Sequence, residues 1–311
     1  MVKQRHHRLL LALCSIIVFQ QQEPAAAQIA VTEEEVPAFE SALEAAQTVL
    51  DSELDEPTLA FEQLSEGSAD PGTELINGTV VDRRFFQAVL RAREPVTCTA
   101  SLIGPATALL AAHCLSPDPA HVKRSVARVR FLFDGDRVDA ICEAAPGYEV
   151  GNSEDWALCL FQRFLIGTFE GVNVSTLPTI NKPIMLTGYG CTQQNEAPNP
   201  NRPLKAGFTE VIALPRGDSF IRTKSEGDQE AILCQGDSGG PAFVLLGSTV
   251  SDSRMIVGVN SQTKIAAGAG FLSATASGAG SDFIRDWVAR NNQTVCGLNA
   301  GSNMRCKWNP S

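Results

Sequence analysis

The sequence lacks a long hydrophobic run, a surplus of positive charge and a pair of closely spaced cysteines. Its apolar stretch at residues 9–19 is too short to span a bilayer, which needs about 20 residues. Without a positive surplus there is no electrostatic reason to expect a nucleic-acid partner. Because no cysteines have CxxC spacing and there are only four histidines, we expect no zinc site, and we predict no cofactor. A chain that is 44% hydrophobic and 19% charged is also too apolar to be natively unfolded.

The N-terminus has the layout of a secretory signal peptide. Five of the first eight residues are basic, residues 9–19 are apolar, and residues 25–27 are three alanines that form a small-residue cleavage site. We therefore expect residues 1–27 to be removed. The mature protein would be secreted, either extracellular or periplasmic, and would have no membrane anchor.

The remaining chain divides by charge. Residues 28–74 hold 13 Asp or Glu and no Lys or Arg, whereas residues 75–311 hold 22 Lys or Arg against 21 Asp or Glu. We predict an acidic pro-segment at 28–74 and a single folded domain at 75–311. Apolar residues at helical spacing in the acidic segment allow a short docking helix, and a solvated linker is equally compatible with them. These residues are Phe39, Leu43, Ala46 and Leu50.

Cysteine usage agrees with export. Cys14 leaves with the signal peptide, and an even number of cysteines in an exported chain predicts four disulfides. Each bridge would contribute on the order of 3 kcal/mol by constraining the unfolded chain. The sequence alone does not choose the pairing. The eight residues are Cys98, Cys114, Cys142, Cys159, Cys191, Cys234, Cys296 and Cys306.

Short patterned segments predict a domain rich in β-structure. Residues 127–133 alternate apolar side chains with arginine, which is typical of a half-buried strand, and residues 242–246 and 255–257 are short apolar runs bounded by Gly or Ser. One helix is expected near the end, with Ser281 as its N-cap. Many short strands and one closing helix indicate an all-β barrel or sandwich. The apolar face of the helix would consist of Phe283, Ile284, Trp287 and Val288.

A serine lies in a glycine-rich turn at residues 236–241, Gly-Asp-Ser-Gly-Gly-Pro. In such a turn the N–H groups of Gly236 and Ser238 can point at one spot, where an oxyanion could bind. A hydroxyl is a weak nucleophile at neutral pH and needs a base. Only His113 and His121 remain after removal of the signal peptide, and His121 lies in a Pro- and Asp-rich segment typical of a surface loop. His113, at the end of an apolar run, is the better candidate base.

A carboxylate should orient that imidazole, and Asp155, at the start of an apolar strand, is the candidate. The order His113, Asp155, Ser238 excludes two other serine hydrolase classes. An α/β-hydrolase has its histidine last, and no histidine follows Ser238. The order Asp, His, Ser would need an aspartate before His113, where the domain offers only Asp82, which has no motif around it.

With these residues the domain at 75–311 resembles the trypsin and chymotrypsin family of serine proteases. The spacings of 42 and 83 residues between the three candidates suit the family. The resemblance implies an all-β fold of two packed antiparallel six-stranded β-barrels with a C-terminal helix and a site between the barrels. The motifs that carry it are Ala111-Ala112-His113-Cys114, Asp155-Trp156-Ala157-Leu158, Gly188-Tyr189-Gly190 and the Gly-Asp-Ser-Gly-Gly-Pro turn.

The resemblance also implies the roles of the site residues. His113 would be general base and then acid, Asp155 its orienting partner, and Ser238 the nucleophile that forms an acyl-enzyme. The N–H groups of Gly236 and Ser238 would bind the oxyanion. The expected function is that of a secreted serine endopeptidase acting as a monomer on protein or peptide substrates.

Activation by cleavage is a further implication of the resemblance. A new α-amino group would pair with Asp237, and the matching segment Leu75-Ile76-Asn77-Gly78 makes Leu75 the new N-terminus. The preceding residue is Glu74, and residues 9–82 contain no Lys or Arg. We therefore expect a zymogen whose activating protease has non-tryptic specificity and cuts after Glu74, or further upstream with later trimming.

The resemblance places Ile232 at the base of the specificity pocket, with Leu233 beside it. Neither is acidic, so a bound Lys or Arg would be left unpaired. We expect an apolar or small residue before the scissile bond. The family's Ser-Trp-Gly wall is replaced by Ser261-Gln262-Thr263, a departure at its last two positions.

For the disulfides, the resemblance supports Cys98–Cys114 beside the catalytic histidine. Proximity and elimination favour Cys142–Cys159, Cys191–Cys234 and Cys296–Cys306, with other pairings still open. An alternative function is a catalytically silent secreted binding protein on the same fold. Gln262, Thr263 and the unusual activation site are the features that keep this alternative open.

Overall fold

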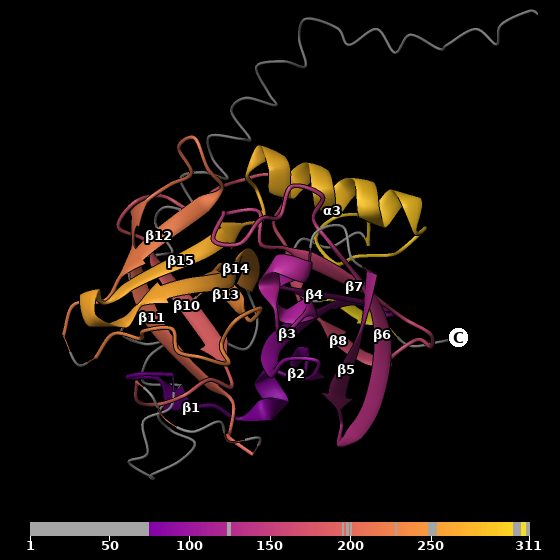
Figure 1. Ribbon diagram of the computed structural model, residues 1–311, viewed down its shortest axis with the longest axis horizontal. Helices are drawn as coiled ribbons and strands as arrows, with labels where there is room; N and C mark the ends of the chain where they lie inside the picture. The colour runs from indigo at the N-terminus through magenta and orange to yellow at the C-terminus, as the bar shows by residue number, and fades with distance from the viewer. Residues whose placement is uncertain are drawn as a thin grey trace, which may run out of the picture. The chain divides into compact units, whose positions relative to one another are not determined.

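The computed structural model describes residues 75–122, 126–194, 196, 199, 201–227, 229–247, 254–300 and 306–308. The predicted signal peptide and acidic pro-segment, residues 1–74, lie outside the described residues. Strands dominate, and the described part contains one α-helix, α3 (Gly278–Arg290), near the C-terminus (Figure 1). Within this part, no helix is long and apolar enough to cross a membrane.

The first half of the domain is a closed barrel of six antiparallel strands. The alternation seen in the sequence explains one of them, because Val129 and Phe131 are buried while Arg130 turns outward to bind Asp139 on the neighbouring strand. In order around the barrel, the strands are β2 (Val89–Glu94), β3 (Cys98–Gly104), β4 (Thr107–Leu110), β7 (Ala157–Phe161), β6 (Asp136–Ala144) and β5 (Val126–Phe133).

The second half forms another antiparallel ring of six strands. This ring runs through β10 (Pro183–Gly188), β11 (Lys205–Ala213), β12 (Phe220–Lys224), β15 (Ala269–Ala274), β14 (Arg254–Lys264) and β13 (Pro241–Leu245), which returns to β10. Together the two barrels confirm the expected fold. In Figure 1 the first barrel is indigo to magenta on the right and the second is largely orange on the left.

Short elements complete the domain. The strand β1 (Thr79–Val80) pairs with β11, β9 (Gly171–Val172) pairs in parallel with β14, and β8 (Gly167–Phe169) pairs with β16 (Cys306–Trp308). The residues that the structure describes also form four 3-10 helices, η1 (Arg83–Phe85), η2 (Ala112–Leu115), η3 (Pro119–His121) and η4 (Ile265–Ala267).

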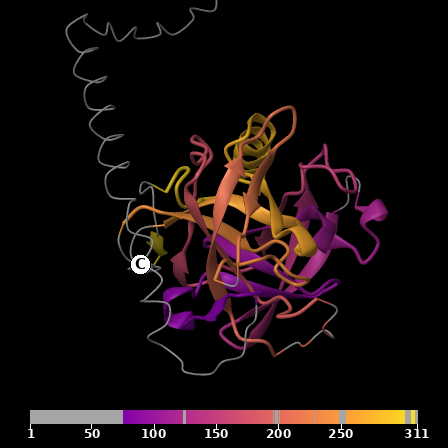
Figure 2. The same ribbon diagram turned by 90° about the vertical axis from the view of Figure 1, so that its left-hand side faces the viewer.

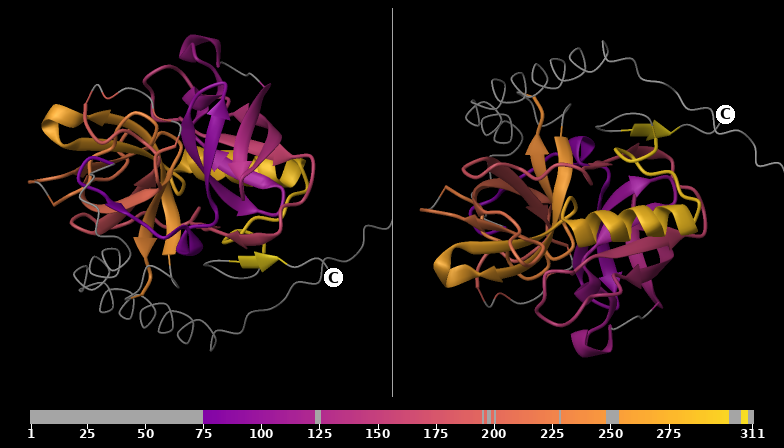
Figure 3. Two further views of the ribbon diagram at one scale, coloured as in Figure 1. Left: turned by 90° about the horizontal axis from the view of Figure 1, so that it is seen from below. Right: turned by 90° about the horizontal axis from the view of Figure 1, so that it is seen from above.

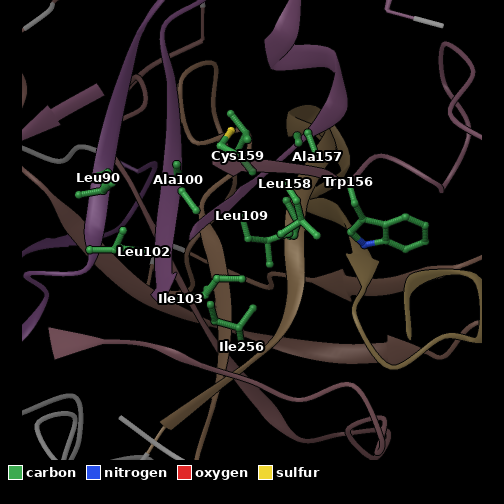
Figure 4. Packing of buried hydrophobic residues seen from close by; sticks show 14 of the residues in the cluster. Leu90, Ala100, Leu102, Ile103, Leu109, Trp156, Ala157, Leu158, Cys159 and Ile256 are labelled. Atoms are coloured by element: carbon green, nitrogen blue, oxygen red, sulfur yellow. The ribbon is translucent and has the colours of Figure 1, made fainter. Parts of the chain in front are cut away.

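The core of the first barrel is apolar, with many aliphatic side chains and two packed phenylalanine rings. Leu109 on β4 lies directly opposite Leu158 on β7, and both are fully buried (Figure 4). Leu90 and Leu102 close the same core from β2 and β3. Burial of a leucine side chain stabilises the fold by about 1.5–3 kcal/mol, so the first barrel is held mainly by apolar packing.

The helix α3 begins earlier than the sequence indicates. Its N-cap is Ser277, whose Oγ accepts the Gly280 N–H at 3.1 Å, and not Ser281. Close packing requires glycine at 280, because a Cβ there would lie 2.4 Å from the Ala274 carbonyl oxygen and 2.9 Å from the Trp156 ring. The predicted apolar face is confirmed, since all four of its residues are buried. Figures 2 and 3 show the yellow helix lying over the strands, and its end near the first barrel is joined to β6 by an Arg290–Glu143 ion pair.

All four predicted disulfides are present. Cys98–Cys114 joins β3 to η2, and Cys142–Cys159 joins directly opposed residues of β6 and β7. Cys191–Cys234 and Cys296–Cys306 complete the set.

A buried ion pair joins the two barrels. Arg254 on β14 binds Glu170, and both side chains are fully buried. The guanidinium lies between two aromatic rings, 4.0 Å from the ring centre of Phe86 and 4.8 Å from that of Phe243. Glu170 is itself tied to the first barrel, because its N–H donates to the Leu102 carbonyl at 3.0 Å.

Candidate active site

The first barrel supplies a histidine bound to a buried carboxylate. His113 lies in η2 just after β4, and Asp155 lies just before β7. The His113 backbone N–H donates to Asp155 Oδ1 at 2.9 Å, and its ring Nδ1 lies 2.7 Å from Oδ2. Ser261 on β14 of the second barrel donates its hydroxyl to the same Oδ2 at 2.6 Å. His121, in contrast, is exposed in η3 beside Asp118.

This environment controls the protonation of His113. Burial acts to lower the pKa of the imidazole, but the charge of Asp155 and its hydrogen bond outweigh burial and raise the pKa above 6.5. Because Nδ1 donates to the Asp155 carboxylate, Nε2 is the nitrogen left to exchange a proton with another group.

Ser238 follows β12 and lies against the histidine segment. The Thr99 N–H of β3 donates to the Ser238 carbonyl at 2.8 Å. A Cβ on the next residue, Gly239, would lie 2.4 Å from the Thr99 carbonyl oxygen and 3.0 Å from the Ala111 nitrogen, so only glycine fits there. Within the described residues the partly exposed Ser238 hydroxyl makes no hydrogen bond, and the bond to His113 is therefore not formed in this structure.

The two N–H groups predicted to bind an oxyanion are oriented by their own peptide planes. In a trans peptide the C=O and N–H point in opposite directions. The Gln235 carbonyl accepts the Cys191 N–H at 2.9 Å, which directs the Gly236 N–H away from Cys191. The Asp237 carbonyl accepts the Gly240 N–H at 2.9 Å, which directs the Ser238 N–H away from Gly240. Among the described residues, neither the Gly236 nor the Ser238 N–H has an acceptor.

The side chain of Asp237 is fully buried beneath this turn. Its Oδ1 accepts the Gly190 N–H at 2.7 Å and its Oδ2 accepts the Cys234 N–H at 2.9 Å. The Cys191–Cys234 disulfide links the two segments that donate these bonds. Burial raises the pKa of Asp237 to about 7, against the opposing effect of the two N–H groups and of the positive charges on Arg202 and Lys205.

Leu75, the residue predicted to become the new N-terminus on activation, lies inside the second barrel. Leu75 is fully buried in its apolar core. Ile76 forms a β-bridge with Ile232, whose N–H donates to the Ile76 carbonyl at 2.9 Å. Leu75 therefore occupies an internal position just ahead of β1.

The five predicted pocket residues do not line one described cavity. Leu233 is 3% exposed and packs in the core beside Gly270, which is paired with Thr263 across β14 and β15. Ser261 instead donates its hydroxyl to Asp155, as described above. Gln262 lines a groove of about 940 Å³ that also contains residues 151–154, just before Asp155.

One compact group of potential metal ligands lies in the described part of the chain, formed by Cys98, His113 and Cys114. Their ligand atoms lie within 4.8 Å of one another. The two sulfur atoms are bonded to each other, so they are not thiolates able to coordinate a metal ion.

Sequence reasoning missed Thr99 and the role of Ser261. The Thr99 hydroxyl accepts the Tyr189 N–H at 3.1 Å and donates to the Gly236 carbonyl at 2.8 Å, so it joins two segments around the site. A polar residue at the start of an apolar strand was the one available signal for Thr99. Lys205 and Arg202 were missed as well, because their burial depends on segments distant in the sequence.

Comparison with known families agrees with this geometry. A family model described as Trypsin matches residues 76–277, and a search of curated proteins found no match. The matched region contains both barrels, the His113–Asp155 pair and the Ser238 turn. Since the family model covers more than half of the chain, the chain belongs to the trypsin family of serine proteases.

Proposed function

We propose that the protein is a secreted serine endopeptidase in which His113, Asp155 and Ser238 form the catalytic triad. The observation that carries this proposal is the double hydrogen bond between His113 and Asp155 next to the Ser238 turn. The two N–H groups without acceptors at Gly236 and Ser238 add a site for developing negative charge.

The reaction follows from the roles of these groups. The Ser238 Oγ attacks the carbonyl carbon of the substrate while His113 Nε2 takes the hydroxyl proton. The resulting oxyanion accepts hydrogen bonds from the N–H groups of Gly236 and Ser238. The C–N bond then breaks as His113 returns the proton to the leaving amine, which leaves an acyl-enzyme. Water, deprotonated by His113, releases the acid and restores Ser238. The hydrogen bond from Ser238 to His113 would form when substrate closes the site.

Substrate preference and processing belong to the same proposal. The apolar side chain at Ile232, where an acidic group would be needed to pair with Lys or Arg, supports an apolar or small residue before the scissile bond. We propose a signal peptide at 1–27 and an acidic pro-segment at 28–74, whose removal frees the α-amino group of Leu75. Four disulfides agree with export to an oxidising compartment.

Fluorophosphonate labelling of the secreted protein, followed by peptide mapping, tests the proposal. We expect one label on Ser238, loss of label and turnover in Ser238→Ala, and retention of both in the matched control Ser281→Ala on α3. Absence of label in both the uncleaved chain and the chain cleaved before Leu75 would contradict the proposal. That result would favour a silent binding protein on the same fold.

A further inference from the structure

Two buried cations lie close to the Asp237 carboxylate. Lys205 begins β11 and is 0% exposed, and Arg202, three residues earlier, is 5% exposed. Lysine is rarely fully buried, because its ammonium group loses its hydration unless negative charge is nearby. Asp237 is a fully buried acidic group whose pKa both cations lower.

Strand register directs the Lys205 side chain toward this carboxylate. Lys205 lies directly opposite Gly188 in the antiparallel pair of β10 and β11. Side chains of directly opposed residues lie on the same face of a sheet. The Cβ that Gly188 lacks would lie 2.1 Å from Asp237 Oδ1. The Lys205 side chain therefore starts out on the face that carries the Asp237 carboxylate.

The anchors of Asp237 all come from its own chain. Its two oxygens accept backbone N–H groups of Gly190 and Cys234, and Lys205 and Arg202 act on it from beyond hydrogen-bond distance. Arg202 also binds Glu196 at 2.9 Å, so the test uses Lys205, which lies directly opposite Gly188. None of these anchors requires cleavage before Leu75.

We propose that Lys205, assisted by Arg202, is a positioning residue that holds the Asp237 carboxylate, and through it the Gly236–Ser238 turn, in place before cleavage. The uncleaved chain then has substantial peptidase activity, and the α-amino group of Leu75 adds to an anchor that already exists. This inference rests on the proposed peptidase function. It also agrees with an acidic segment that offers no Lys or Arg to a tryptic activator.

The test compares uncleaved and cleaved forms of one full-length protein. The substitutions Pro71→Asp, Gly72→Asp, Thr73→Asp and Glu74→Lys follow Asp70 and create an enteropeptidase site directly before Leu75. Intact mass verifies that the 74–75 bond is whole in the uncleaved form. The rate of fluorophosphonate labelling at Ser238 and kcat/KM on a peptide substrate are then measured before and after cleavage.

We expect the uncleaved protein to react within about tenfold of the cleaved protein, and Lys205→Met to slow the uncleaved form by about tenfold or more. After cleavage, Lys205→Met should recover to within about threefold of the unsubstituted protein, because the α-amino group supplies the missing charge. A merely structural role would not produce this recovery. The matched control is Lys224→Met, at an exposed lysine of the same barrel, which should leave both forms unchanged.

Three results would overturn the inference. One is an uncleaved protein that is inert while the cleaved protein is active. Another is Lys205→Met that reacts as fast as the unsubstituted protein before cleavage, and the third is Lys205→Met that is slow in both forms. Failure of both forms of the unsubstituted protein to label would refute the proposed function itself, which separates the two failures.

Discussion

The two barrels hold their contributions to the site by different means. In the first barrel, His113 and Asp155 adjoin strands β4 and β7, whose buried leucines face each other, and a disulfide ties the histidine segment to β3. In the second barrel, Ser238 lies on a loop that the Cys191–Cys234 disulfide also ties down, but the carboxyl group beneath it, Asp237, is held by hydrogen bonds and lies near the buried cation Lys205.

The difference shows which half can respond to its surroundings. Apolar packing is lost only when the fold itself opens. The stabilisation from a buried charged group, in contrast, changes with its protonation and with any charge placed beside it. We therefore expect His113 and Asp155 to be in place both before and after cleavage. The serine turn is the half that pH, cleavage or substitution can adjust.

The largest effect is expected from disabling the first half alone. Asp155→Asn should lower kcat at neutral pH by about 10⁴-fold, because an amide no longer holds the His113 tautomer that accepts a proton at Nε2. Steady-state kinetics on a peptide substrate measure the loss. Asp136→Asn, at the exposed start of β6, is the control and should leave kcat unchanged. An Asp155→Asn protein that keeps a large share of kcat would remove this aspartate from the triad.

A smaller effect, on stability, should come from the charged anchor of the second half. The folded uncleaved chain holds the Asp237 proton up to a pKa of about 7, against an ordinary value of 3.8, so the folded state binds more protons than the unfolded state between these values. Raising the pH from 4 to 7 should thus lower the free energy of unfolding by up to about 1.4 kcal/mol per pH unit from this group.

Urea unfolding of uncleaved wild type and Asp237→Asn at several pH values measures that slope. The stability difference between the two proteins should change in this window and level off above pH 7. A difference that stays constant with pH would show that Asp237 is already ionised throughout.

The contact between the halves is tested at Thr99. Thr99→Val removes the hydroxyl that binds the Gly236 carbonyl, so that a buried carbonyl loses its partner at a cost of about 1–3 kcal/mol. We expect a lower kcat with KM unchanged, and recovery in Thr99→Ser, which restores the hydroxyl. Kinetics and thermal unfolding of the two variants separate this role from simple packing, since equal losses in both variants would indicate packing.

The smallest effect is expected at the helix, outside both halves of the site. Ser277→Ala removes the N-cap of α3 and should lower the free energy of unfolding by about 1 kcal/mol without changing kcat. Ser281→Ala, at the N-cap expected from the sequence, should have almost no effect. If the two variants rank the other way, the helix begins where the sequence placed it.

Much of the fold was predictable because its signals are local. Alternation in β5, the apolar face of α3 and the glycine-rich turn at Ser238 all follow from short stretches of sequence. The N-cap was misplaced because Gly278 and Gly280 are poor helix formers. Glycine is needed at 280 because a Cβ there would lie against the Ala274 carbonyl and against the ring of Trp156, which lies 124 residues earlier in the chain.

The residues that sequence reasoning missed depend on partners remote in the chain. Lys205 at a strand end is typical of a solvated residue, and only the assembly of β1, β10 and β11 buries it. Ser261 was placed in a specificity pocket because of its motif, yet its hydroxyl binds Asp155 across the two barrels. No local pattern predicts such contacts, because each requires the register of strands that are far apart in sequence.

The Arg254–Glu170 pair has a consequence for how the halves find each other. The active site combines residues of both barrels and exists only when they pack in one alignment. A docking error of a single residue would strand an arginine and a glutamate in an apolar seam, at a cost of about 3–5 kcal/mol for a lone buried charge. The pair therefore favours the observed packing of the two barrels over arrangements shifted by one residue.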